Sequence, residues 1–300
     1  MSFSDAANGQ CLATANGLCV NLGLSSVPET TLMTLHSRVS VASDLFKDWF
    51  VDDKAVEIYR AIDYDYEQSF GKAMEIFGIR SWLFDQGVLE FWKKNPGGGT
   101  IVNFAEGLET QRFRPGIIAG RPEGSLWITV DLPPAIKARE QFIMPDDENL
   151  HVSASVLDTG EWMHLVPKDK PVFFTAQGLF MYLEEEDTRV LFQKMAKEFP
   201  SSSIWFDSIA KWLSQKTMSG LKLTDHYQAP PMPFGTNKNN APGVFKSWVP
   251  NMEVEEVPWP FEMCSGFFFH YVSPILINLP YIQNAQLNMV FNVTFPPSLN

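Results

Sequence analysis

The 300-residue sequence has only three cysteines, Cys11, Cys19 and Cys264, and none belongs to a CxxC pair or lies near a cluster of histidines. Structural zinc sites use such spacings, and small disulfide-rich domains use a dense, even set of cysteines. We therefore expect no metal site and no disulfide framework. This cysteine usage favours a reducing, cytoplasmic setting.

Basic residues and long apolar runs are also scarce. There are 23 Lys and Arg against 35 Asp and Glu, a net charge of −12, and no basic run that would attract phosphates. The longest apolar stretch, Gly266–Leu279, is interrupted by polar residues and a proline, and the first ten residues lack a basic segment leading into an apolar one. We expect no nucleic-acid partner, no membrane span and no signal peptide. The sequence leaves monomer and homodimer open.

A hydrophobic content of 45%, with 13% aromatic residues, is enough for a large buried core. Residues 1–24 are rich in small polar residues, and helical patterns follow as far as residue 73. We predict a leader and helical cap over residues 1–73 and a core domain over residues 74–300. Within the core, residues 208–260 are rich in proline and asparagine, which predicts an inserted lid.

Helical and strand patterns alternate from residue 77 onward, which is typical of a mostly parallel α/β sheet with helices on both faces. The predicted helices are Phe77–Lys94, Pro133–Phe142 and Glu185–Phe199. The predicted strands are Thr100–Phe104, Leu126–Val130, His151–Ser155, Pro171–Ala176, Ser203–Asp207, Gly266–Tyr271 and Leu287–Phe295.

The segment around Gly107 carries the first sign of a cofactor. An apolar strand runs into a turn containing this glycine, and Asp131 closes a second apolar strand roughly 20 residues later, a spacing used to hold nucleotide-type cofactors. The turn lacks the G-x-G-x-x-G pattern and carries Glu106 and Glu109, which would repel a pyrophosphate. S-adenosylmethionine has no phosphate and bears a sulfonium, so carboxylates in the turn suit it electrostatically.

A series of segments between about Pro28 and Val249 occurs in the order found in one known family. In the N-terminal part these are ETTLMTLHSRVSVAS, LFKDWFVDDKAVEIYRAIDYDY and FGIRSWLFDQGVLEFWKKNP. In the core they are IVNFAEGLETQRFRP, WITVDLPPAIKARE, HVSASVLDTGEW, TAQGLFMYLEEEDTRVLF and APPMPFG. The chain resembles the leucine carboxyl methyltransferase-like group of class I S-adenosylmethionine-dependent methyltransferases, especially its branch of polyketide-type O-methyltransferases.

The resemblance implies a Rossmann-like sheet of seven strands, S-adenosylmethionine as cofactor and methyl transfer to oxygen, as in secondary metabolism. It also implies roles for matching residues. Arg80 matches the arginine that binds the cofactor's carboxylate, although it could instead pair with Asp85 on the surface. Asp131 matches the ribose-binding carboxylate, although it could instead cap the loop before Pro133. The implied cofactor-binding residues are Arg38, Arg80, Ala105, Glu106, Gly107, Asp131, Leu132, Ser155, Val156, Gln177 and Gly178.

Several positions depart from the family pattern. Ala105 replaces a glycine and is unstrained only at negative φ, while Ser155 and Gln177 replace an aspartate and a glutamate. The others are Val41 for glutamate, Glu109 for aspartate and Gln111 for arginine. These departures leave open a non-catalytic relative that has kept the fold and binds a small molecule.

No residue stands out as a general base. A carboxylate acceptor needs none, whereas a phenol with a pKa of about 10 benefits from one. Low-ranking substrate-side candidates are His226, Tyr227 and Tyr182, with Asp225 and His36 as further possible bases. We expect a small natural-product-like acceptor methylated on a carboxyl or a phenolic hydroxyl group, with carboxyl slightly favoured. Methylation of a protein C-terminal carboxylate is the alternative within the enzymes.

Overall fold

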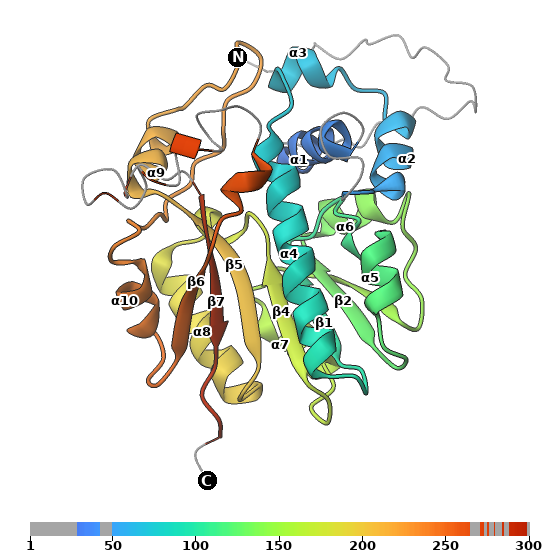
Figure 1. Ribbon diagram of the computed structural model, residues 1–300, viewed down its shortest axis with the longest axis vertical. Helices are drawn as coiled ribbons and strands as arrows, with labels where there is room; N and C mark the ends of the chain where they lie inside the picture. Colours follow the sequence, from blue (N-terminus) through green and yellow to red (C-terminus); the bar gives the residue numbers. More distant parts are fainter. Residues whose placement is uncertain are drawn as a thin grey trace, which may run out of the picture.

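The computed structural model describes residues 29–42, 50–264 and 288–298, together with residues 271, 272, 275, 279 and 284. In these residues one seven-stranded sheet is covered by helices on both faces, and a group of short helices lies over one end (Figure 1). The helices in this part of the chain are too short or too polar to span a bilayer.

The helices and strands follow in an order that alternates through most of the core. The helices are α1 (Thr30–Ser40), α2 (Asp53–Ala61), α3 (Tyr66–Phe70), α4 (Glu75–Lys94), α5 (Pro115–Gly120), α6 (Pro133–Arg139), α7 (Thr159–Trp162), α8 (Glu185–Glu198), α9 (Lys211–Met218) and α10 (Ala241–Lys246). The strands are β1 (Thr100–Phe104), β2 (Leu126–Asp131), β3 (Asn149–Ser153), β4 (Val172–Ala176), β5 (Ser203–Ile209), β6 (Glu253–Val257) and β7 (Asn288–Thr294).

The strand order is β3-β2-β1-β4-β5-β7-β6, with β7 antiparallel to both of its neighbours. Strands β1 to β5 are parallel, and the chain switches direction across the sheet between β1 and β4. Ligands of open α/β sheets bind beside such a switch, at the carboxyl ends of the strands. The topology therefore directs attention to the ends of β1 and β4.

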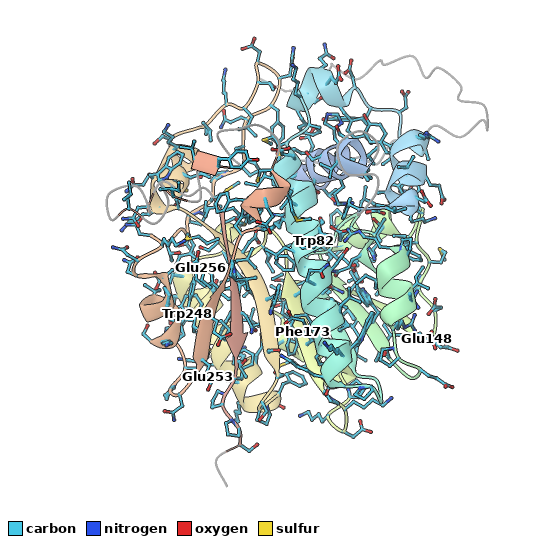
Figure 2. The ribbon with its side chains drawn as sticks, in the orientation of Figure 1. Trp82, Glu148, Phe173, Trp248, Glu253 and Glu256 are labelled. Atoms are coloured by element: carbon cyan, nitrogen blue, oxygen red, sulfur yellow. The ribbon has the colours of Figure 1, made fainter. Side chains whose placement is uncertain are left out.

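The alternation of side chains along β1 divides the core into two layers. Val102 faces the layer that contains residues of α7, α8 and α10, and Ile101 faces the layer formed with α4 and α5. On the α4 side, the ring of Phe173 stacks on that of Phe91 with centroids 5.4 Å apart (Figure 2). On the other side, Trp248 packs in the cluster that includes residues of α8 and α10.

Helices α1, α2 and α3 form a helical cap with its own apolar cluster, which includes Leu35, Ile58, Tyr66 and Phe70. Asp52 and Asp65 start α2 and α3 by accepting hydrogen bonds from Ala55 N and Gln68 N. In Figure 1 the cap lies above the carboxyl ends of the parallel strands. It is thus placed to close a site over those ends.

The predicted class, a mostly parallel seven-stranded α/β sheet with helices on both faces and at the N-terminus, is confirmed. The prediction missed one strand. Most of the predicted strand Gly266–Tyr271 lies outside the described residues, whereas β6 lies inside the segment 208–260 that we predicted as lid. Polarity hid this strand, because β6 is an edge strand whose sequence, EVEEV, has three glutamates.

Candidate functional site

A cavity of about 540 Å³ opens over the carboxyl ends of β1, β2 and β4, next to the direction switch. This size is ordinary for a ligand site, roughly 300–1,000 Å³. All residues that the resemblance implied as cofactor-binding line this one cavity: Arg38, Arg80, Ala105, Glu106, Gly107, Asp131, Leu132, Ser155, Val156, Gln177 and Gly178. Their roles in binding stay predictions.

The turn after β1 takes an unusual backbone conformation. Ala105 and Gly107 both have φ of 52°, in the left-handed region that favours glycine. A side chain at Gly107 would place its Cβ 2.4 Å from Thr31 Oγ1 of the cap, so only glycine fits there. Ala105, by contrast, is an alanine in a strained conformation, at the position where the resemblance implies a glycine.

Replacing Ala105 with glycine should therefore stabilise the protein. Left-handed backbone costs an alanine roughly 1–2 kcal/mol, and part of the gain is offset by the greater freedom of glycine in the unfolded chain, so we expect a net gain of about 1 kcal/mol. Thermal unfolding of Ala105→Gly measures it. Ala138→Gly, in helix α6, is the matched control and should lower stability by a similar amount. A lower midpoint for both variants would contradict the strain at Ala105.

Asp131 ends β2 and joins the turn to the following loop. Its Oδ2 accepts a hydrogen bond from Gly107 N at 2.7 Å, and its Oδ1 accepts one from Leu132 N at 2.7 Å. Burial, only partly offset by these hydrogen bonds, raises the pKa of Asp131 to about 6. Asp131 is 8% exposed and lines the cavity, where its carboxyl group can accept further hydrogen bonds.

The sequence suggested that the two glutamates of the turn present free carboxylates to the cofactor, but both are paired with arginines. Glu106 accepts a hydrogen bond from Thr129 and lies 3.1 Å from Arg139 Nη2, and burial raises its pKa. Glu109 is bound by Arg114 and lies 3.4 Å from Arg38 Nη1. Although burial opposes it, the arginines hold the pKa of Glu109 at about 2. Ion pairing thus offsets much of the negative charge that we expected the turn to present to a sulfonium.

Arg80, on α4, donates from Nη1 to Asp207 Oδ2 at 2.8 Å and lies over the ring of Phe77. The alternative pairing with Asp85 is wrong, because Asp85 instead binds Arg114 at 2.5 Å. Arg38 is buried, donates from Nη2 to Leu108 O at 2.8 Å, and has its pKa lowered by burial. Both guanidinium groups line the cavity.

Several buried polar atoms of the cavity lining make no hydrogen bond in the described part of the chain. Among them are two donors, Arg80 Nε and Asn103 Nδ2, and one acceptor, Gln177 Oε1; a further donor, Arg38 Nε, lies 3.8 Å from Asp52 Oδ2 in an ion pair. An unpaired buried polar group costs about 1–3 kcal/mol, so a ligand that completes these bonds is favoured. A carboxylate for the donors and an ammonium for the acceptor would do so, which fits the methionine part of S-adenosylmethionine.

Sequence reasoning missed Asn103 and Asp207. Asn103 lies near the end of β1, its Oδ1 accepts a hydrogen bond from Thr175 Oγ1, and the residue is 3% exposed. Asp207 lies in β5 and is 1% exposed. The available signal was a polar residue near the carboxyl end of an apolar strand, but only the topology brings these strand ends together.

A second part of the cavity lining is apolar. It includes methionines 33, 74, 181 and 232, together with Phe77 of α4. Leu213 on α9 and Leu221 and Leu223 beyond it come from the predicted lid segment. Such a surface suits a largely apolar ligand, because methionine adapts to the shape of what it contacts.

The substrate-side candidates separate clearly. Tyr182 lines the cavity, and burial raises its pKa to about 12. Tyr227 is not among the lining residues and packs against Phe70 in the cap, while His226 is exposed. Asp225 is exposed as well. His36 is buried in the cap beside Tyr59 and Gly71 O, away from the lining.

No family model matches the chain. The tetracenomycin polyketide synthesis O-methyltransferase TcmP of Streptomyces glaucescens is 28% identical over 78% of this chain and 83% of TcmP. The S-adenosyl-L-methionine-dependent methyltransferase dpfgK of Gibberella zeae is 25% identical over 60% of this chain and 64% of dpfgK.

Two solved structures share the fold. A candidate methyltransferase from Thermobifida fusca has a TM-score of 0.52 and 15% identity, over 91% of this chain and 100% of that one. A DUF574 family protein from Streptomyces avermitilis has a TM-score of 0.50 and 16% identity, over 73% and 82% of the two chains. These likenesses identify the sheet and its helices as the class I methyltransferase fold.

Proposed function

We propose that the chain is a class I S-adenosylmethionine-dependent O-methyltransferase that methylates a small, largely apolar, natural-product-like acceptor on a carboxyl group rather than a phenolic hydroxyl. The observation that carries this choice is the lining of the cavity. It joins a polar floor at the strand ends to an apolar surface, and none of its described lining residues is a histidine.

We propose that the cofactor's methionine part lies on the polar floor, with its carboxylate at Arg80 and Asn103 and its ammonium at Gln177. The ribose hydroxyls then donate to Asp131 at the end of β2, which lies two strands along the sheet from β4 and Gln177. Leu132, Ser155 and Val156 follow the ends of β2 and β3, and we assign them to the adenine. This orientation is supported by the unpaired atoms at one end and by the buried carboxyl group of Asp131 at the other.

S-adenosylmethionine supplies an activated methyl group when bound, and the protein's task is to align an oxygen with it and to keep water out. The cap and the segment after β5 provide the apolar walls for this task. We therefore retain residues 1–73 as leader and cap, and within residues 208–260 we restrict the proposed lid to the part between β5 and β6. The protein would act in the cytoplasm, as a monomer or homodimer.

The lack of a histidine among the described lining residues favours a carboxylate acceptor. A carboxylate is already ionised at neutral pH, whereas a phenol must lose a proton of pKa about 10. Asp207, Glu109 and Glu106 each bind an arginine. The pKa of Tyr182 is about 12, so its hydroxyl is already protonated near neutral pH and cannot accept a proton. None of these groups is placed to serve as the base that a phenol would need.

Calorimetric titration with S-adenosylmethionine and S-adenosylhomocysteine is the first test, and we expect micromolar binding of both. A screen with hydroxynaphthoic acids then compares the two acceptor groups in one molecule. A methyl ester is hydrolysed by alkali to methanol, and an aryl methyl ether is not. We expect an ester, with Tyr182→Phe retaining the rate of the wild type. An ether product whose formation depends on Tyr182 would overturn the carboxyl assignment, and absence of cofactor binding would favour a non-catalytic relative.

A further inference from the structure

Asp207 connects two parts of the cavity that are far apart in the sequence. Its Oδ2 accepts from Arg80 Nη1 of α4 at 2.8 Å, and its Oδ1 accepts from Gly178 N, in the turn after β4, at 2.5 Å. Both partners line the cavity. A carboxylate that is 99% buried is costly unless it is paired and hydrogen-bonded, and these two contacts meet that need.

The guanidinium of Arg80 is held from three sides. Asp207 binds Nη1, the ring of Phe77 lies 5.1 Å from Cζ, and the backbone of Gly178 approaches so closely that a Cβ there would lie 3.3 Å from Nη1. Gly178 has φ of 68°, which also favours glycine. Held in this way, Arg80 keeps one buried donor, Nε, without a partner in the described part of the chain.

We propose that Asp207 is a positioning residue, which fixes Arg80 and the Gly178 turn in the geometry that receives the carboxylate of the cofactor's methionine part. This inference rests on the proposed function, in which Arg80 binds that carboxylate. Asp207 itself does not touch the reacting atoms.

Preorganisation is the physical reason for such a residue. A free arginine side chain loses considerable rotamer entropy when it binds a ligand, and a rigid one has already lost it on folding. One oxygen of Asp207 accepts from Arg80 Nη1 and the other accepts from Gly178 N, so the arginine and the turn are held in a fixed position relative to each other. Loss of this clamp should weaken the binding of a ligand only if that ligand carries the amino-acid group.

The test is the substitution Asp207→Asn, read with two ligands. S-adenosylhomocysteine carries the amino-acid group, whereas 5′-methylthioadenosine has the same nucleoside and a thioether but lacks that group. The asparagine can still accept from Gly178 N but loses the ion pair with Arg80. We expect the Kd for S-adenosylhomocysteine to rise about tenfold or more. The Kd for 5′-methylthioadenosine should stay at the wild-type value, which also shows that the variant is folded.

A double-mutant cycle with Arg80→Gln separates this inference from the proposed function. If Asp207 acts through Arg80, Asp207→Asn has no further effect on S-adenosylhomocysteine binding in the Arg80→Gln background. Normal binding by Arg80→Gln alone would overturn the assignment of Arg80. Weak binding by Arg80→Gln with normal binding by Asp207→Asn would overturn the role of Asp207, and so would equal weakening of both ligands by Asp207→Asn. If Asp207→Asn does not fold, Asp207→Glu keeps the charge, displaces it by one methylene, and is held to the same two-ligand criterion.

Discussion

Asp131→Ala should weaken the binding of S-adenosylmethionine by about ten- to a hundredfold, because hydrogen bonds to a charged group are worth about 1.5–3 kcal/mol. The ribose hydroxyls would lose the carboxyl group that accepts their hydrogen bonds, and the amides of Gly107 and Leu132 would lose the acceptor that holds the turn. Calorimetric titration measures the change. Asp147→Ala, at an exposed position outside the cavity lining, is the control and should bind like the wild type.

The pH dependence of binding gives Asp131 a separate signature. Burial raises its pKa from 3.8 to about 6, so the carboxyl group of the free protein is largely protonated at about pH 5 and ionised at neutral pH. A ribose hydroxyl donates best to the ionised form. Affinity should therefore fall about tenfold between neutral pH and pH 5, because one pH unit below the pKa leaves roughly a tenth of the group ionised. Asp131→Ala should lose this dependence.

The raised pKa of Asp131 changes the stability of the free protein with pH in the opposite direction to the affinity for the cofactor. Because the folded pKa lies above the ordinary value, the favourable contribution of Asp131 is fully present below about pH 3.8 and is lost as the pH rises through about 6. Cofactor binding thus improves over a pH range in which the free protein loses the stability that comes from protonated Asp131. An affinity for S-adenosylmethionine that is unaltered by Asp131→Ala at neutral pH would place the ribose site elsewhere.

Arg114→Met should cause the largest loss of stability among the variants considered, about 3–5 kcal/mol, because it leaves buried carboxylates without their partner. Arg114 donates from Nε to Asp52 at 3.0 Å, from Nη1 to Asp85 at 2.5 Å, and from Nη2 to Glu109. The loss is a large fraction of a typical domain stability of about 5–15 kcal/mol. Chemical denaturation would measure it.

Acidic conditions should reduce the difference between Arg114→Met and the wild type. In the variant the carboxyl groups that face the missing guanidinium gain protons more readily, and a neutral carboxyl costs less to bury. In the wild type the pKa of Glu109 is about 2, below its ordinary value of 4.5. Its contribution to stability is therefore fully present above about pH 4.5 and is lost as the pH falls towards about 2. Arg189→Met, which removes a partly exposed arginine that pairs with Glu186 on the surface, should match the wild type. Equal stability of Arg114→Met and wild type would show that the buried cluster contributes nothing.

The buried cluster also links the cap to the cofactor turn. Asp52 is the N-cap residue of α2, and Thr110, just after the turn, donates to its carboxylate at 2.6 Å and 2.7 Å. Arg38 of α1 donates to Leu108 O within the turn. These contacts join the helices above the sheet to the loop that lines the cavity, so damage to the cluster should affect cofactor affinity as well as stability.

The class of the fold could be predicted from the pattern of the sequence, and the cofactor from the resemblance of its segments to a known family. Apolar strands and amphipathic helices alternate with the periods that a parallel α/β sheet requires, and strand β1, Thr100–Phe104, was predicted with its observed ends. The spacing from Gly107 to Asp131 is a local signal, and it reflects one strand-turn-helix-strand unit whose geometry is fixed by chain length. Edge strand β6 escaped prediction because its solvent-facing glutamates remove the apolar pattern.

The charges that face the cavity could not be identified before the three-dimensional packing was known. Glu106, Glu109 and Asp207 are all acidic in the sequence, and nothing local shows that each one is paired with an arginine from a distant element, Arg139, Arg38 and Arg80 respectively. Likewise, His226 and Tyr182 could not be ranked until the fold left one exposed and placed the other in the cavity wall. Strand and helix patterns are set by neighbours in the chain, whereas the partner of a buried charge is set by the packing of elements that lie far apart in sequence.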